Sequence, residues 1–182
     1  MPEAEPNWRL FVALDVPPAA AAPIRAIQRQ WEGRCRARFT PPENLHLTLK
    51  FLGERPVDEV PALRAALRSV PFAPFTGTLD ELGVFAGRGP LRILWLRLAG
   101  PEVMALQTAV DAALADRFAP ETRFMSHLTI ARLKQVPDRR RFLDELAAFT
   151  FDPIPFPVTA FTLKRSVLTP DGPIYSDVER YS

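Results

Sequence analysis

Two short segments of the chain alternate hydrophobic and polar residues, and both contain the pattern histidine–leucine–threonine–hydrophobic. Alternation with a period of two is typical of a half-buried strand, in which residues i and i+2 face the same side. Each segment is therefore predicted to present one imidazole and one hydroxyl on one face and to bury aliphatic side chains on the other. The pairs are His46 and Thr48 in residues 45–52, and His127 and Thr129 in residues 124–133.

The remaining elements follow from the same kind of pattern. Runs of strand-forming residues bounded by Pro or Gly predict strands at 9–16, 35–39, 75–85, 91–98, 156–168 and 174–181. Apolar residues at helical spacing predict helices at 19–31, 57–70, 102–118 and 138–149. Residues 1–7 are expected to form a loose tail, residues 87–90 a turn, and residues 171–172 a hairpin turn.

The order of elements indicates an internal repeat. The histidines are 127 − 46 = 81 residues apart, and the threonines are 129 − 48 = 81 apart. Each half reads strand, helix, motif strand, helix, strand. We therefore expect one domain of two lobes over residues 1–182, with half-repeats at about 8–86 and 90–170 and a C-terminal strand that completes the sheet. A pseudo-twofold axis between the lobes brings both His-x-Thr pairs to one cleft.

Composition restricts the class of protein. With 182 residues and 47% hydrophobic content, the chain is long enough to bury a real core. A net charge of +2 neither demands nor excludes a nucleic-acid partner. The single cysteine, Cys35, excludes an intrachain disulfide and a cysteine metal cluster. The acidic start is unlike a signal peptide, and no apolar run reaches the roughly 18 residues of a membrane span. A soluble cytoplasmic protein is predicted.

Two imidazoles in one cleft suit acid–base chemistry. A histidine with an ordinary pKa of about 6.5 acts near neutral pH as a base or as an acid. A pair of them fits in-line displacement at phosphorus, with one ring taking a proton from water and the other protonating the departing sugar oxygen. Threonine hydroxyls can hold the non-bridging oxygens. The residues do not say which ring is the acid, because the repeat makes them nearly equivalent.

The phosphoryl group would also need a positive charge nearby. Arg132 is the nearest candidate, but strict alternation after Thr129 turns its side chain away unless the strand bends or ends there. Lys50 shares the alternation of His46 and Thr48, which places it at the rim of the cleft or in solvent.

Other site chemistries are less well supported. Zinc usually takes three or four protein ligands, and neither motif contains a carboxylate. We therefore expect no metal and no cofactor. A Ser-His-Asp arrangement is disfavoured because Ser126 adjoins His127 and points to the opposite face of the strand.

The chain resembles the two-histidine phosphoesterase superfamily, most closely the bacterial RNA 2′,3′-cyclic phosphodiesterases (2′-5′ RNA ligase-like). The resemblance rests on residues 9–15, on residues 44–53 and on the second motif. The resemblance implies an α+β fold with an antiparallel sheet in each lobe. It also implies metal-independent opening of a 2′,3′-cyclic phosphate to a 2′-phosphomonoester. The implied roles are proton donor for His46, activator of water for His127, and phosphate binding for Thr48, Thr129 and Arg132.

Two alternatives stay open at this stage. One is a module that binds RNA ends without chemistry, in which Phe11, Trp95 or Tyr175 stacks on a base, although each is more typical of a core. The other is the reverse reaction, 2′-5′ joining of RNA ends. The expected partners are RNA ends or small nucleotides with a 2′,3′-cyclic phosphate, and no membrane. The sequence leaves the oligomeric state open, with a monomer as the default expectation.

Overall fold

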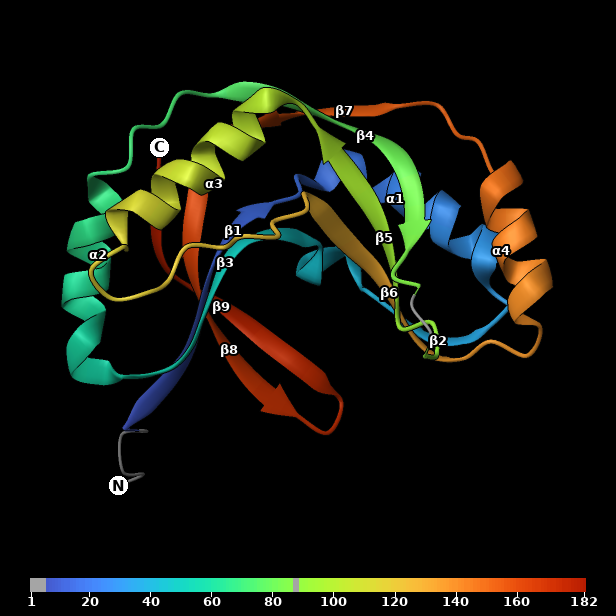
Figure 1. Ribbon diagram of the computed structural model, residues 1–182, viewed down its shortest axis with the longest axis horizontal. Coiled ribbons are helices and arrows are strands. Elements are labelled where there is room, and N and C mark those ends of the chain that lie inside the picture. Colours follow the sequence, from blue (N-terminus) through green and yellow to red (C-terminus); the bar gives the residue numbers. More distant parts are fainter. Residues whose placement is uncertain (1–5, 87–88) are drawn as a thin grey trace.

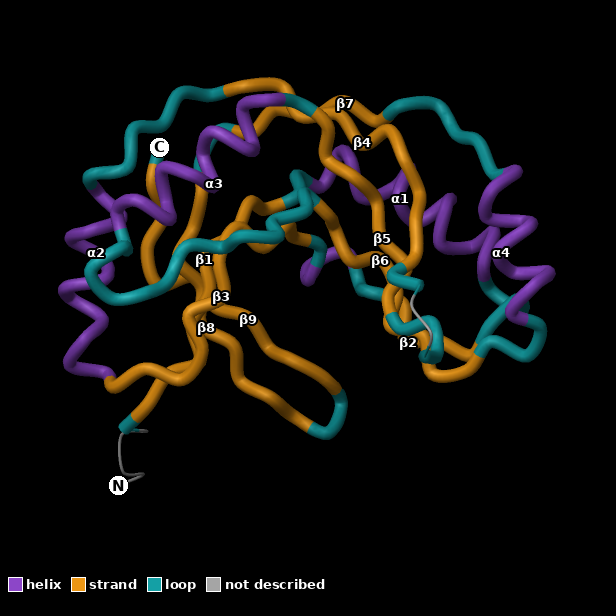
Figure 2. Tube along the Cα trace, viewed as in Figure 1, coloured by secondary structure: helices purple, strands orange, loops and turns teal. Residues whose placement is uncertain are grey.

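The computed structural model describes residues 6–86 and 89–182, so part of the predicted tail and of the 87–90 turn lies outside the described residues. The described chain is α+β, with nine strands and four α-helices (Figures 1 and 2). The strands are β1 (Asn7–Asp15), β2 (Arg36–Phe39), β3 (His46–Pro56), β4 (Phe75–Val84), β5 (Ile93–Ala99), β6 (His127–Gln135), β7 (Ile154–Val158), β8 (Phe161–Thr169) and β9 (Gly172–Tyr181). The helices are α1 (Pro18–Trp31), α2 (Val60–Arg68), α3 (Pro101–Ala113) and α4 (Arg139–Ala148), with short 3-10 turns η1 (Pro42–Asn44) and η2 (Val57–Glu59).

The strand order is symmetric about the two motif strands. It runs β7-β4-β5-β6-β3-β1-β8-β9, with β2 paired to β6, and every strand pair is antiparallel. Exchanging β3 with β6, β1 with β5, β8 with β4 and β9 with β7 returns the same order, as a pseudo-twofold axis requires. The α+β fold class is confirmed, with the sheets of the two lobes joined where Leu47 pairs with Leu128. The assignment of residues 1–182 to one domain stays a prediction.

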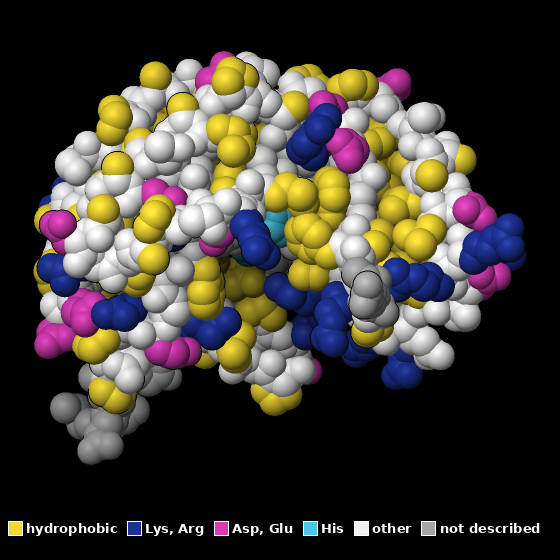
Figure 3. Space-filling view, in the orientation of Figure 1, with side chains coloured by type: hydrophobic (Ala, Val, Ile, Leu, Met, Phe, Trp, Pro, Cys, Tyr) yellow, Lys and Arg dark blue, Asp and Glu magenta, His cyan; other side chains and the backbone are white. Residues whose placement is uncertain are grey.

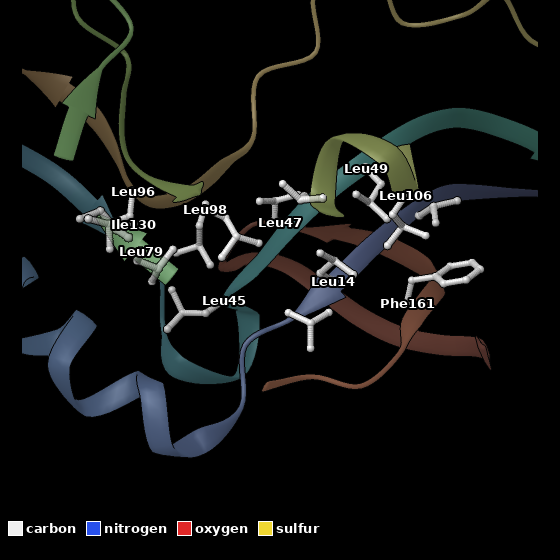
Figure 4. Packing of buried hydrophobic residues seen from close by; sticks show 14 of the residues in the cluster. Leu14, Leu45, Leu47, Leu49, Leu79, Leu96, Leu98, Leu106, Ile130 and Phe161 are labelled. Atoms are coloured by element: carbon white, nitrogen blue, oxygen red, sulfur yellow. The ribbon is translucent and has the colours of Figure 1, made fainter. Parts of the chain in front are cut away.

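The lobes do not coincide with the halves of the sequence. The first lobe holds β1, β3, β8 and β9, and the second holds β2, β4, β5, β6 and β7 (Figure 1). Helix α1 follows β1 but packs against β6 and β7, whereas α3 follows β5 but packs against β3. One buried cluster runs through both lobes, with Leu45 and Leu47 lying between the side chains of the two (Figure 4). Each half of the sequence therefore helps to cover the strands of the other.

Both motif strands contain a β-bulge just after the threonine. In β3, Thr48 pairs with Ala13 and Lys50 with Val12, so Leu49 has no partner in β1. In β6 the same occurs at Ile130, which is 130 − 49 = 81 residues later. A bulge inserts one extra residue and reverses the facing of every side chain beyond it. The alternation assumed from the sequence therefore holds up to the threonines and fails after them.

The bulge in β6 is supported from α1. The Ile130 carbonyl accepts hydrogen bonds from Gln28 Nε2 at 2.9 Å and from the Thr40 backbone N–H at 2.9 Å. Gln28 is only 2% exposed and also donates to the Thr40 carbonyl at 2.8 Å. The Ile130 carbonyl thus accepts two hydrogen bonds, and the Gln28 amide joins β6 to the end of β2 at this point, so Gln28 stabilises the irregular backbone.

The bulge in β3 buries Lys50, and the prediction that Lys50 lies at the cleft rim or in solvent is wrong. The residue is 7% exposed and forms an ion pair with Asp111 on α3. Its ammonium group also donates to the Ala119 carbonyl at 2.8 Å. The physical reason is the reversal at Leu49, which turns Lys50 to the inner face of the sheet and Phe51 to the outer one.

The predicted strand at 156–168 is also wrong, because it is two strands. Strand β7 pairs with β4 in the second lobe, and β8 pairs with β1 in the first. Thr159 and Ala160 separate them and connect the lobes. The run of strand-forming residues continues through this connection, so the local sequence does not indicate where one strand ends and the next begins. Two helices are also shorter than predicted: α3 ends at Ala113, and α2 begins only after the 3-10 turn η2.

Candidate active site

The structure brings all five predicted site residues together. His46 and Thr48 on β3, and His127, Thr129 and Arg132 on β6, line one cleft with a volume of about 580 Å³. The space-filling view shows a hollow with a histidine visible inside it and with Lys and Arg side chains gathered beside it (Figure 3). Convergence follows from the antiparallel pairing of Leu47 with Leu128, since each lies between the histidine and the threonine of its motif.

Both imidazoles are oriented in the same way. His46 Nδ1 lies 2.8 Å from the Asn44 carbonyl oxygen, and His127 Nδ1 lies 2.8 Å from the Met125 carbonyl oxygen. A carbonyl can only accept, so Nδ1 carries the hydrogen and donates it in each ring. Nε2 is then the atom that exchanges a proton. Backbone carbonyls have no signature in the sequence, and the sequence analysis did not identify these two contacts.

His46 packs between two aromatic rings. Its ring centroid lies 5.0 Å from that of Phe11 and 4.9 Å from that of Tyr175, and the Tyr175 ring meets it edge-on. Burial also raises the pKa of Tyr175, so its phenol stays neutral. Tyr175 lines the cleft, whereas Phe11 is 3% exposed and lines only a smaller hollow beside it.

His127 has a similar neighbour in the second lobe. Phe85, just beyond β4, meets it edge-on at a centroid distance of 4.9 Å. Trp95 on β5 packs against Phe85 and is buried. Of the three aromatic residues considered for base stacking, Tyr175 alone is among the residues that line the cleft.

The surroundings of His46 disfavour its charged form. Burial lowers the pKa of this imidazole below the ordinary 6.5, and the hydrogen bond to the Asn44 carbonyl opposes that shift only in part. Lys164 and Arg132 lower the pKa further, whereas Asp15 raises it. Lys164 is held behind the site by Asp15 at 2.8 Å and by Asp177. The free site therefore favours neutral His46, and an anion bound in the cleft would favour its protonation.

Arg132 faces the cleft because of the bulge at Ile130, which reverses the alternation in β6. Its partner across the strand pair is Arg38 on β2, which also lines the cleft. Neither guanidinium makes a hydrogen bond or an ion pair within residues 6–86 and 89–182. Like charges directly opposite each other are unfavourable in a sheet, so the pair is suited to a bound anion. The sequence did not predict a role for Arg38, because the pairing of β2 with β6 joins segments that are distant in the chain.

Other groups near the motifs have structural roles. Ser126 is buried, and its hydroxyl donates to the Leu98 carbonyl at 2.7 Å, away from the cleft as predicted. In the described residues, no three His, Cys, Asp or Glu side chains are grouped in a way that could hold a metal ion. None of the helices in the described chain is long and apolar enough to cross a membrane.

Comparisons with known proteins identify relatives that match this chain along most of its length. A family model for LigT-like phosphoesterases matches residues 14–95 and 99–175. An Archaeoglobus fulgidus protein named RNA 2′,3′-cyclic phosphodiesterase is 32% identical over 173 residues, which cover 93% of this chain and 97% of the relative. A crystal structure of a Thermus thermophilus protein is similar with a TM-score of 0.79 and 29% identity, covering 96% of this chain and 97% of that one. Escherichia coli LigT complexed with 3′-AMP gives a TM-score of 0.76 and 27% identity, with 96% and 97% covered.

Proposed function

Because the chain belongs to the LigT-like phosphoesterase family, we propose that it is an RNA 2′,3′-cyclic phosphodiesterase that yields a 2′-phosphomonoester. The observation that carries the proposal is the pair of imidazoles in one cleft, each with Nδ1 bound to a carbonyl and Nε2 left for proton transfer. A module that only binds phosphate would not need two such groups. The names of the relatives supply the substrate class.

In the proposed reaction, His127 Nε2 accepts a proton from water as the water oxygen forms a bond to phosphorus. The bond from phosphorus to the 3′ oxygen breaks, and protonated His46 donates its Nε2 proton to that oxygen. The phosphate remains on the 2′ oxygen. Thr48 and Thr129 hydroxyls donate to the non-bridging oxygens, and Arg132 stabilises the charge that develops on them. If a 5′-hydroxyl replaces water as the nucleophile, the same steps form a 2′-5′ linkage.

The proposal is tested by product analysis. The protein is incubated in EDTA with adenosine 2′,3′-cyclic phosphate and, separately, with adenosine 3′,5′-cyclic phosphate. We expect turnover of the first substrate alone, with the 2′-phosphate as product and no effect of EDTA, because the two histidines provide both acid and base. Chromatography against 2′-AMP and 3′-AMP standards identifies the product. Formation of 3′-AMP, or loss of activity in EDTA, would contradict the proposed chemistry.

The pH dependence of the reaction tests whether the two rings act as an acid–base pair. His46 must be protonated to act as the acid, but burial lowers its pKa below 6.5 in the free protein. Because one ring must be charged and the other neutral, we expect a bell-shaped kcat/KM whose acidic limb has an apparent pKa below 6.5. In kcat, which reports the complex, this limb should lie at higher pH, because the bound phosphate favours the imidazolium.

Initial rates from pH 4.5 to 9 give both profiles. Exchanging the roles of the two rings leaves the shape of this profile unchanged, so the profile tests the pair of rings together. A kcat/KM that is level from about pH 4.5 to 9 would contradict acid–base catalysis by two histidines.

A further inference from the structure

The cleft extends beyond the histidines in two directions. A second hollow of about 320 Å³ shares His46, Thr48 and Arg132 with the main cleft and continues toward Phe51. Arg38 does not line that hollow; it lines the main cleft alone. Arg132 is thus common to both spaces and lies at the centre, whereas Arg38 lies toward one end.

The position of Arg38 at that end is set by the β8–β9 hairpin. Gly172 opens β9 with φ of +125°, a conformation that favours glycine. A Cβ at this position would overlap Arg38 Nη2, so the guanidinium occupies the space that a side chain would take. Arg38 belongs to the second lobe and the hairpin to the first. The guanidinium therefore lies where the two lobes meet at the edge of the cleft.

The donors of Arg38 are unused in the described chain. Glu43 and Asp171 also line the cleft, but in the described chain neither forms an ion pair with Arg38. Its side chain is exposed, and it faces Arg132 across the strand pair. A forked guanidinium with free N–H groups beside a second arginine is suited to bind phosphate. Two arginines at different positions along one cleft can bind two phosphates of one chain.

We propose that Arg38 binds the phosphodiester next to the terminal nucleoside, so that the preferred substrates are ends of RNA chains rather than mononucleotides. This inference rests on the proposed function, because it takes the cyclic phosphate to lie between His46 and His127. Arg132 then serves the reacting phosphate, and Arg38 serves the next phosphate along the RNA. The competing arrangement, in which both arginines hold the reacting phosphate, predicts equal losses for short and long substrates.

The test compares two substrates that differ by one internal phosphodiester. kcat/KM is measured for adenosine 2′,3′-cyclic phosphate and for the dinucleotide ApA with a terminal 2′,3′-cyclic phosphate. We expect the wild type to prefer the dinucleotide, and Arg38→Ala to reduce the ratio of the two values about tenfold or more, since a hydrogen bond to a charged group is lost. Arg38→Lys should lie between them, because lysine keeps the charge but not the fork.

The matched control is Arg36→Ala. Arg36 lies on the same strand, is exposed and carries the same charge, but it does not line the cleft, so the ratio should keep its wild-type value. A wild type without preference, or an Arg38→Ala variant that keeps the preference or slows both substrates equally, would overturn the proposal.

Binding measurements test the role of Arg38 independently of the proposed catalytic activity. Calorimetry with 2′-AMP and with ApA 2′-phosphate reports the subsite even if neither cyclic substrate is turned over. Arg38→Ala should weaken the binding of ApA 2′-phosphate about tenfold and leave the affinity for 2′-AMP unchanged, because only the dinucleotide has the phosphate that Arg38 contacts. If this loss is seen while neither cyclic substrate is turned over, the proposed phosphodiesterase activity is contradicted and the role of Arg38 is not. An affinity for ApA 2′-phosphate that is the same in the wild type and in Arg38→Ala would contradict the role of Arg38.

Discussion

Replacing His127 by alanine is expected to lower kcat for the cyclic phosphate by roughly 10²- to 10⁴-fold, the usual contribution of a positioned acid or base. His46→Ala should have an effect of the same size. The two rings act in one displacement, so the double variant should lose much less than the product of the two single losses. Steady-state rates for the three variants measure this directly.

Thermal melting of the same preparations is the control that shows whether the variants are folded. Both histidines are only partly buried, and each makes one hydrogen bond to a backbone carbonyl, so the melting temperatures should change little. Either single variant with near wild-type kcat would remove that ring from the mechanism. Variants that lose activity together with their melting transition would assign the effect to folding.

The second large effect concerns stability rather than catalysis. Lys50→Met is expected to lower the free energy of unfolding by about 3–5 kcal/mol, because Asp111 would remain buried without its cation. Burial opposes the charge of Asp111, but hydrogen bonds from Lys50, the Glu121 backbone N–H and Gln107 outweigh it and hold the pKa of Asp111 below its ordinary value. Urea unfolding at pH 7 measures the change.

Two further variants test whether the loss of stability comes from the unpaired charge of Asp111. Replacing both partners, with Lys50→Met and Asp111→Leu, should recover much of the loss, because no unpaired charge then remains buried. Arg140→Ala removes an exposed ion pair to Asp144 and should change stability by less than about 1 kcal/mol. A loss below about 1 kcal/mol for Lys50→Met alone would show that Asp111 finds another partner or is neutralised.

The sequence predicted the centre of the site because its signals there are local and repeated. The alternation around His46 and His127 predicts which side chains share a face, and the shared offset of 81 residues indicates that the two strands are equivalent. Leu47 and Leu128 are in fact paired in the structure. The chemistry of paired imidazoles then follows from residue type alone.

What the sequence did not predict depends on contacts between distant segments. The bulges at Leu49 and Ile130 are invisible locally, because a leucine or isoleucine fits the alternation whether or not it has a partner. They decide that Arg132 faces the cleft and that Lys50 does not. To predict that Arg38 lines the cleft, one would have to know that β2 pairs with β6. No pattern within residues 35–39 contains that information.

The crossed packing of α1 and α3 has a consequence for how far the lobes can move. A seam of one residue pair, Leu47 with Leu128, would by itself bend easily. The chain crosses it twice in short connections, because β1 ends at Asp15 in the first lobe before α1 packs on the second, and β5 ends at Ala99 in the second lobe before α3 packs on the first. The buried contact of Gln28 with the Ile130 carbonyl holds α1 on β6, and the buried Lys50–Asp111 ion pair holds α3 on β3. Opening the seam would strain these connections or break one of these contacts, so hinge motion is costly. The spacing of the two imidazoles is therefore restrained by the fold, and the RNA end that we propose as substrate would enter a cleft whose width changes little.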